Sequence, residues 1–244
     1  MTVGERPSTL YRLGGVAVLL TLVFYVSQFV FIQWDDYPAS TEQWFALFAR
    51  SRLLGLFTMN ALDIVSITLF GVMFLALRTA LRSAGPSWTA VGGYFGFLGV
   101  GVFVAPRVAM LSMLPLAERY AAATDQLLRA RLLAAGETLG ALGTPTPQTV
   151  GFLFIAVAVF VMSIVMLREG RLFRRIVPWF GILAGVATFV NHLSLLLLPS
   201  LATPLMIAGG LFWFPYWLLM GLGLLRLARM ADREQFRYPL GRPG

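Results

Sequence analysis

Six long apolar stretches follow one another along this chain, separated by short polar segments. They cover residues 14–32, 53–77, 88–114, 146–167, 176–198 and 204–227. Each is long enough to cross a bilayer as a helix, which takes roughly 17–25 apolar residues. The polar stretches between them are no longer than a loop or one short helix. We therefore expect an all-α, polytopic bundle of six transmembrane helices, forming a single domain over residues 1–244.

Two of the connecting segments are themselves patterned as helices. Residues 41–51 place aromatic and aliphatic side chains beside Glu42, Gln43 and Arg50. In residues 116–142, apolar positions recur between charged ones. Such a pattern is typical of a helix that lies in the membrane interface or caps a bundle. We expect interfacial helices here, and both a simple connector and a lid over a site remain open.

The distribution of charge predicts the orientation in the membrane. All nineteen basic residues are arginine, and the chain is 58% hydrophobic but only 12% charged. The termini and the loops on their side hold thirteen arginines, whereas the opposite side holds five. Because cytoplasmic loops are enriched in basic residues, this asymmetry places both termini in the cytoplasm. The arginines flank apolar stretches instead of forming one continuous face, so we expect no nucleic-acid partner, and membrane lipids as the surroundings.

Missing residue types exclude several chemistries. Lysine and cysteine are absent, and histidine occurs once. A Schiff base, a disulfide, an iron–sulfur cluster, a bis-histidine haem and a three-histidine zinc site are therefore excluded. No nucleophile elbow, zinc-binding helix motif or phosphate-binding loop is present either. We predict no metal, cofactor or catalytic residue, and enzymatic activity is the least favoured hypothesis.

A few polar side chains interrupt the apolar stretches and form the candidate site. Polar groups in hydrocarbon are costly and usually face the protein interior, where they serve function. Counting residues from the span ends places these groups at similar depth in the outer half of the bilayer, with Asp63 about 15 Å and Arg107 about 10 Å below the surface. The candidate ligand-binding residues are Asn60, Asp63, Arg107, Asn191, His192, Trp213 and Tyr216.

Asp63 and Arg107 are predicted to form an ion pair between the second and third spans. An ionised carboxylate alone in hydrocarbon is unfavourable, and Arg107 is the only cation within a span. Asn60 shares a helix face with Asp63, so we expect it, and His192, to add hydrogen bonds. Such a pair has two open interpretations: it binds a ligand or ion, or it only fixes which helices face each other.

Small residues predict close helix packing. Gly92, Gly96 and Gly99 share one face of the third span. Small residues at such spacing let helix backbones approach closely in lipid. The same interpretation applies to Gly209–Gly210 and Gly221 in the sixth span.

The order of these features resembles a family of bacterial six-span membrane proteins grouped as a domain of unknown function. The likeness is carried by the stretch DIVSITLFGVMFLALR from Asp63 to Arg78, by Pro106-Arg107-Val108, and by residues 151–199 with their basic loop and PWFGILAG. It covers roughly residues 50–228 and departs from the family pattern at Asn191-His192 and at FWFPYW in the sixth span. The resemblance implies a six-helix bundle in the plasma membrane and no assigned activity.

Two functional hypotheses remain. In the first, the polar residues bind or transport a small molecule, lipid or ion from the outer side of the membrane. In the second, the protein is a non-catalytic structural or regulatory component whose polar cluster sets only helix packing. A cavity that reaches Asp63 and Arg107 favours the first, and a dry, tightly packed pair favours the second.

Overall fold

The computed structural model describes residues 7–31, 37–142 and 145–237, which are mostly helical and include no strand. Among these residues, six helices are long and apolar enough to cross a membrane. The expected all-α, six-span architecture is therefore confirmed. The six helices are α1 (Pro7–Phe31), α4 (Leu62–Leu81), α5 (Pro86–Met110), α8 (Pro145–Glu169), α9 (Ile176–Leu197) and α10 (Ala202–Arg237).

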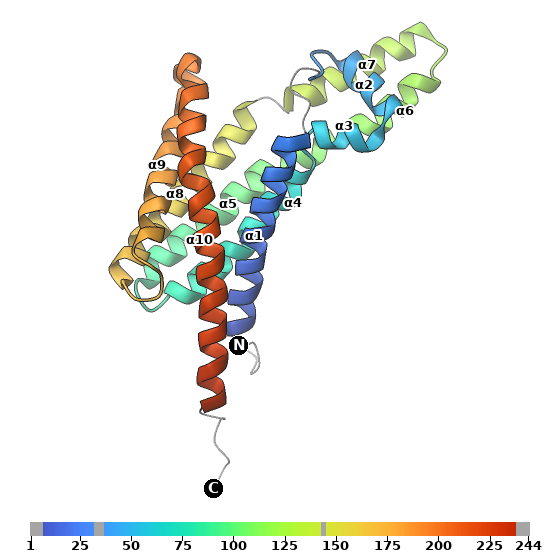
Figure 1. Cartoon of the computed structure of the whole chain (residues 1–244). Coiled ribbons are helices and arrows are strands. Elements are labelled where there is room, and N and C mark those ends of the chain that lie inside the picture. The colour runs from blue at the N-terminus through green and yellow to red at the C-terminus, as the bar shows by residue number, and fades with distance from the viewer. Residues whose placement is uncertain (1–6, 32–36, 143–144, 238–244) are drawn as a thin grey trace.

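The six long helices pack as a closed ring in chain order. Each contacts the next, from α1 through α4, α5, α8 and α9 to α10, and α10 returns to α1 (Figure 1). Helix α4 also touches α8, and its Phe70, Met73 and Phe74 are fully buried in the core. Exposed aliphatic side chains such as Val23 and Leu211 cover the outside of the bundle. In a membrane these side chains face lipid.

Four shorter helices form a lobe at the end of the bundle away from the termini (Figure 1). The lobe has its own small core, in which Phe45 and Phe48 pack against Met113 and Ala117. Both segments expected to be helical outside the spans are helical here. The lobe consists of α2 (Thr41–Arg50), α3 (Arg52–Thr58), α6 (Met113–Ala122) and α7 (Gln126–Leu142).

Two expected continuous helices are broken in the structure. The predicted span 53–77 is divided, because α3 belongs to the lobe and α4 begins only at Leu62. The segment 116–142 is divided between α6 and α7, whose hairpin turns at residues 123–125. The carboxylate of Asp125 accepts the backbone N–H groups of Leu127 and Leu128, which caps the start of α7.

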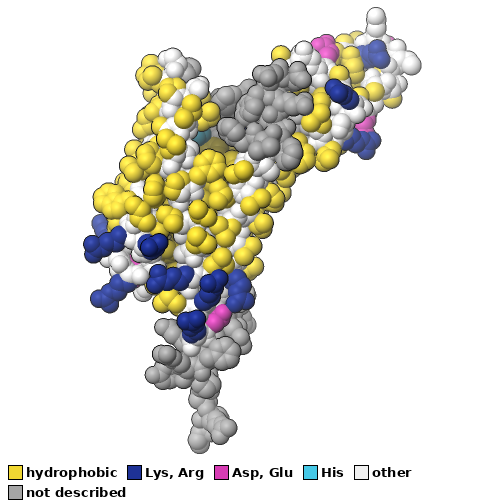
Figure 2. All heavy atoms as spheres, in the orientation of Figure 1, with side chains coloured by type: hydrophobic (Ala, Val, Ile, Leu, Met, Phe, Trp, Pro, Cys, Tyr) yellow, Lys and Arg dark blue, Asp and Glu magenta, His cyan; other side chains and the backbone are white. Residues whose placement is uncertain are grey.

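Arginines gather at the end of the bundle that carries the termini (Figure 2). A broad hydrophobic band separates this group from the charged side chains on the lobe. Arg12 and Asp232 form an exposed ion pair at the terminal end, with Nη2 and Oδ2 2.7 Å apart. The molecule thus has an apolar middle and two charged ends, as a membrane-spanning protein requires.

Candidate functional site

Asp63 is positioned by the break between α3 and α4. Asn60 adopts a left-handed backbone conformation with φ of 59°, which reverses the chain between the two helices. Its carbonyl accepts the backbone N–H of Asp63 at 2.9 Å and so closes the turn. Asp63 therefore lies in the first turn of α4, not ten residues into a helix. The predicted depth of about 15 Å was wrong, because the residues counted as its outer part belong to α3.

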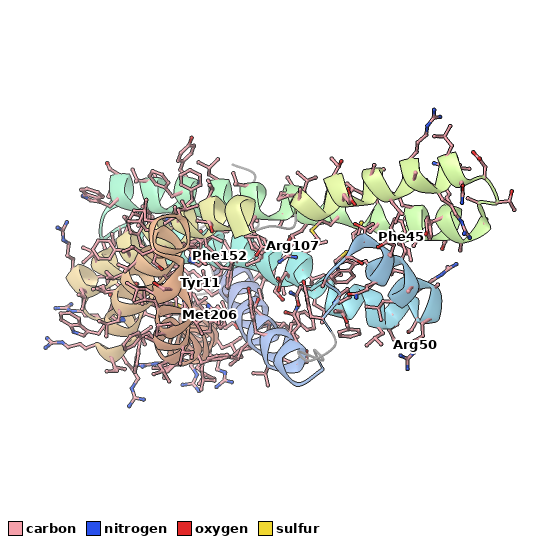
Figure 3. The ribbon with its side chains drawn as sticks, turned by 90° about the horizontal axis from the view of Figure 1, so that it is seen from above. Tyr11, Phe45, Arg50, Arg107, Phe152 and Met206 are labelled. Atoms are coloured by element: carbon pink, nitrogen blue, oxygen red, sulfur yellow. The ribbon has the colours of Figure 1, made fainter. Side chains whose placement is uncertain are left out.

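The predicted ion pair between Asp63 and Arg107 is present. Nη2 of Arg107, near the end of α5, lies 3.6 Å from Oδ2 of Asp63, and the two side chains are only 8% and 11% exposed. Nη1 donates a hydrogen bond of 3.2 Å to the carbonyl of Met59. The guanidinium therefore joins α5 both to α4 and to the connection that precedes it. Figure 3 places Arg107 where the bundle meets the lobe.

Buried polar atoms without hydrogen-bond partners are found in this pair and in two residues near it. They are Nε2 of Gln28, Oδ1 of Asn60, Oδ1 of Asp63 and Nε of Arg107. The Gln28 amide, from α1, faces the Asp63 carboxylate but is not placed to form a hydrogen bond of normal geometry with it. We call these four residues the outer polar cluster. Oδ1 of Asn60 does not form the expected hydrogen bond to the pair. This buried acceptor is thus without a partner, which is rare in proteins.

Two tyrosines lie in the electrostatic field of the cluster. Tyr25, on α1, interacts with both Asp63 and Arg107. Tyr37 precedes α2 and packs edge-on against Trp44, with ring centroids 5.4 Å apart. Partial burial raises the pKa of the Tyr37 hydroxyl above its ordinary value, whereas the positive charge of Arg107 opposes the rise.

Asn191, His192 and Trp213 form a second group, around Thr188 of α9. Nδ1 of His192 donates to the Thr188 carbonyl at 2.9 Å, and the indole N–H of Trp213 donates to the Thr188 hydroxyl. Asn191 is 7% exposed, and its Oδ1 has no partner. The imidazole lies on the ring of Phe152, with centroids 4.8 Å apart. These contacts hold the histidine to its own helix and to α8.

Two phenyl rings separate His192 from Arg107. The Arg107 guanidinium lies 5.6 Å from the Phe103 ring centroid, and Phe103 meets Phe152 edge-on at 5.0 Å. Phe152 in turn packs against the imidazole ring of His192. Within the described residues, no hydrogen bond joins His192 to the ion pair. The expectation that His192 supports the pair was wrong, and six of the seven candidates fall into two separate groups.

Tyr216 belongs to the aromatic core instead of either polar group. It is fully buried and meets Trp213 edge-on, with centroids 5.8 Å apart. Its hydroxyl and that of Ser163 on α8 are both buried without a hydrogen bond of normal geometry. Ser163 and Ser66 were not among the candidate residues predicted from the sequence, although both hydroxyls are buried and unpaired. Ser66 follows Asp63 by three residues, so helical spacing was the available signal.

Two cavities can be described, and neither is lined by the ion pair. One, of about 220 Å³, lies between α8 and α9 and is apolar. The other, of about 400 Å³, lies in the lobe between Arg50, Arg52 and the α6 residue Glu118. Arg52 and Glu118 form an ion pair of 2.8 Å beside it. The outer polar cluster is thus a buried group of side chains outside both cavities.

Comparison of the chain with known proteins finds no relative. No family, no curated protein and no solved structure matches this chain. The family resemblance drawn from the sequence therefore stays a prediction. Among the described residues, no group of three histidine, aspartate or glutamate side chains could hold a metal ion. The functional argument rests on the geometry of the outer polar cluster.

Substitution of Asn60 is expected to separate its backbone role from its side-chain role. Asn60→Ala should lower the free energy of unfolding by about 1–2 kcal/mol, because a left-handed conformation is unfavourable for alanine. Asn60→Gly should retain most of the stability, since glycine adopts this conformation readily. Equilibrium unfolding in detergent micelles would measure both. Equal stability of the two variants would show that the left-handed turn does not constrain the fold.

Proposed function

We propose that this chain is a multi-pass protein of the bacterial inner membrane that binds or transports a small polar molecule at the outer polar cluster. Both termini lie in the cytoplasm in this proposal, and the lobe lies on the outer side. The arginines gathered at the terminal end support the orientation (Figure 2). The resemblance to a six-span family of the bacterial plasma membrane agrees with this location.

The proposal rests on one observation, the unpaired polar atoms around the buried ion pair. Four such atoms, on Gln28, Asn60, Asp63 and Arg107, lie at the outer ends of α1, α4 and α5. Buried polar atoms in proteins are nearly always hydrogen-bonded to protein, water or ligand. Leaving them without partners costs about 1–3 kcal/mol each. A polar molecule that filled these positions would gain affinity from satisfying them.

A structural role is the alternative, and two observations favour it. Neither of the two cavities described above is lined by Asp63 or Arg107. Arg107 donates to the carbonyl of Met59, so it holds the α3–α4 connection against α5. In this alternative the pair positions the lobe on the bundle, and water fills the remaining hydrogen bonds. Both roles need Asp63 and Arg107 in place. They differ in whether a ligand stabilises the folded protein.

Ligand-induced thermal stabilisation separates the two roles. The purified full-length protein is heated in micelles with a panel of small polar metabolites and lipids. If the cluster binds one of them, the unfolding temperature should rise. At a ligand concentration a hundredfold above Kd, binding stabilises the folded protein by about 2.7 kcal/mol. The Asp63→Asn variant should lose this rise, since it removes the buried charge.

Asp232→Asn is the matched control. It makes the same chemical change in the exposed Arg12–Asp232 ion pair at the opposite end of the molecule. This variant should respond to the ligand as the unchanged protein does. If no compound in the panel raises the unfolding temperature, or if Asp63→Asn and Asp232→Asn respond alike, the binding proposal is wrong and the structural role is favoured.

A further inference from the structure

We propose that the ligand of the outer polar cluster is a zwitterion that carries a primary ammonium and an anionic oxygen group on a short linker. This inference rests on the proposed binding function and names the chemical class of its ligand. Two sources share this chemistry: a free amino acid, and the phosphoethanolamine headgroup of a lipid. Three features of the cluster support it, namely its charge balance, its free donors and acceptors, and the separation of its ion pair.

The charge balance of the cluster disfavours a ligand with net charge. Asp63 and Arg107 contribute one negative and one positive charge, and both side chains are buried. A bound cation or anion would leave one uncompensated charge in an environment of low dielectric constant, which is strongly unfavourable. A ligand without net charge keeps the site neutral. This class contains neutral polar molecules and zwitterions.

The free atoms of the cluster are two acceptors and two donors. Oδ1 of Asn60 and Oδ1 of Asp63 accept, and neither has a partner. An ammonium group, which only donates, suits these two oxygens. Nε of Arg107 donates and is equally unpaired, and Nε2 of Gln28 donates and faces the Asp63 carboxylate without a hydrogen bond of normal geometry. A carboxylate or phosphate, which only accepts, suits these two nitrogens.

The separation of the ion pair favours a zwitterion over a neutral molecule. Nη2 of Arg107 and Oδ2 of Asp63 are 3.6 Å apart. A hydrogen bond between such charged groups is usually about 2.7–2.9 Å long. The two charges are thus near each other but not directly hydrogen-bonded, so each retains capacity for a charged partner. A zwitterion offers one opposite charge to each, whereas an amide or alcohol offers only dipoles.

The position of the cluster is compatible with both sources. Asp63 lies in the first turn of α4, and Arg107 lies three residues before the end of α5 at Met110. In the proposed orientation these helix ends are the outer ends of their spans. Lipid headgroups occupy the interfacial region just beyond the hydrocarbon core. A headgroup in the outer leaflet and a free amino acid outside the membrane therefore both approach from this end.

The test compares four small probes on the full-length protein in micelles. Glycine carries both charges, ethylamine only the cation, acetate only the anion, and propionamide neither. Glycine should bind with a Kd at least roughly tenfold lower than any of the other three, since one additional charged hydrogen bond contributes about 1.5–3 kcal/mol. The lipid source is tested in vesicles of phosphatidylethanolamine or phosphatidylglycerol with the same acyl chains. Stabilisation by the former alone identifies a headgroup ligand.

Two variants keep the test independent of folding. Gln28→Leu and Asn60→Gly leave the ion pair intact but remove one free donor and one free acceptor, respectively. Each should weaken glycine or phosphatidylethanolamine binding while the protein remains folded. If propionamide binds as tightly as glycine, the zwitterion inference is wrong and the binding proposal survives. If none of the four probes, the two lipids and the compounds of the metabolite panel stabilises the protein, both proposals are wrong.

Discussion

Arg107→Leu is expected to lower the free energy of unfolding by about 3–5 kcal/mol, because it leaves the Asp63 carboxylate buried without its cation. The same change removes the hydrogen bond that Arg107 donates to the Met59 carbonyl. Equilibrium unfolding in mixed micelles measures the loss. Since the guanidinium joins α5 to the α3–α4 connection, hydrogen exchange should also accelerate in α3.

The matched control is Arg52→Leu. Arg52 pairs with Glu118 at 2.8 Å, a shorter distance than that of the buried pair, but both side chains are exposed. Loss of an exposed pair typically changes stability by only about 0–1 kcal/mol. Burial and not distance should therefore decide the outcome. If Arg52→Leu and Arg107→Leu are equally destabilising, the argument from burial fails.

Exchanging the two charges tests the pair itself. The double variant Asp63→Arg with Arg107→Asp should be more stable than either single variant, because each single change places two like charges in contact. It should remain less stable than the unchanged protein, since the hydrogen bond from Arg107 to Met59 is lost. If the double variant is no more stable than either single variant, Asp63 and Arg107 do not form an ion pair.

Hydrophobicity along the chain was sufficient to predict the six spans, because a bilayer sets both their length and their composition. The ion pair was predictable for a related reason: Asp63 and Arg107 are ionisable residues within apolar stretches, and such residues seek each other. The break before α4 was not predictable from hydrophobicity. Residues 53–57 are apolar because one side of α3 packs into the lobe. A helix that faces lipid has the same residue types, so hydrophobicity does not distinguish the two cases.

The separation between the two polar groups was also not predictable from the sequence pattern. Counting residues along each helix gives a depth but no distance across the bundle. Asn191 and His192 lie near the C-terminal end of α9, yet Phe152 of α8 lies between the imidazole and Phe103. Only the packing order of the ring, with α8 between α5 and α9, reveals this separation.

Helix packing in lipid depends on close backbone contact, and the glycines show where this occurs. Gly92, Gly96 and Gly99 are all buried, but only Gly99 lies against a neighbouring backbone, that of α8. Gly92 faces the Met162 side chain of α8, and Gly96 faces the Phe74 side chain of α4, so the three do not meet one partner helix. Gly221 packs against α1, as predicted. The prediction was wrong for Gly209–Gly210, where added Cβ atoms would meet no other atom closer than 3.9 Å. Small residues pack helices together only on the face that meets a partner.

Gly99→Leu is expected to lower the free energy of unfolding by about 3 kcal/mol, the upper end of the usual cost of overpacking. A Cβ atom at Gly99 would lie 2.8 Å from the carbonyl oxygen of Gly151 and 2.9 Å from the backbone nitrogen of Ile155 on α8. Backbone atoms cannot rotate away as a side chain can, so α5 and α8 must separate. Unfolding in mixed micelles, with the helix separation followed by a spin-label pair, measures both effects.

Gly101→Leu provides the control on the same helix. Two residues further along α5, a Cβ atom at Gly101 meets nothing within 4 Å. Leucine there should be neutral or stabilising by up to about 1 kcal/mol, because glycine disfavours helices relative to leucine and the position faces lipid. The two substitutions are chemically identical and differ only in the helix face that they occupy. Equal losses at both positions would show that α5 and α8 are not in backbone contact at Gly99.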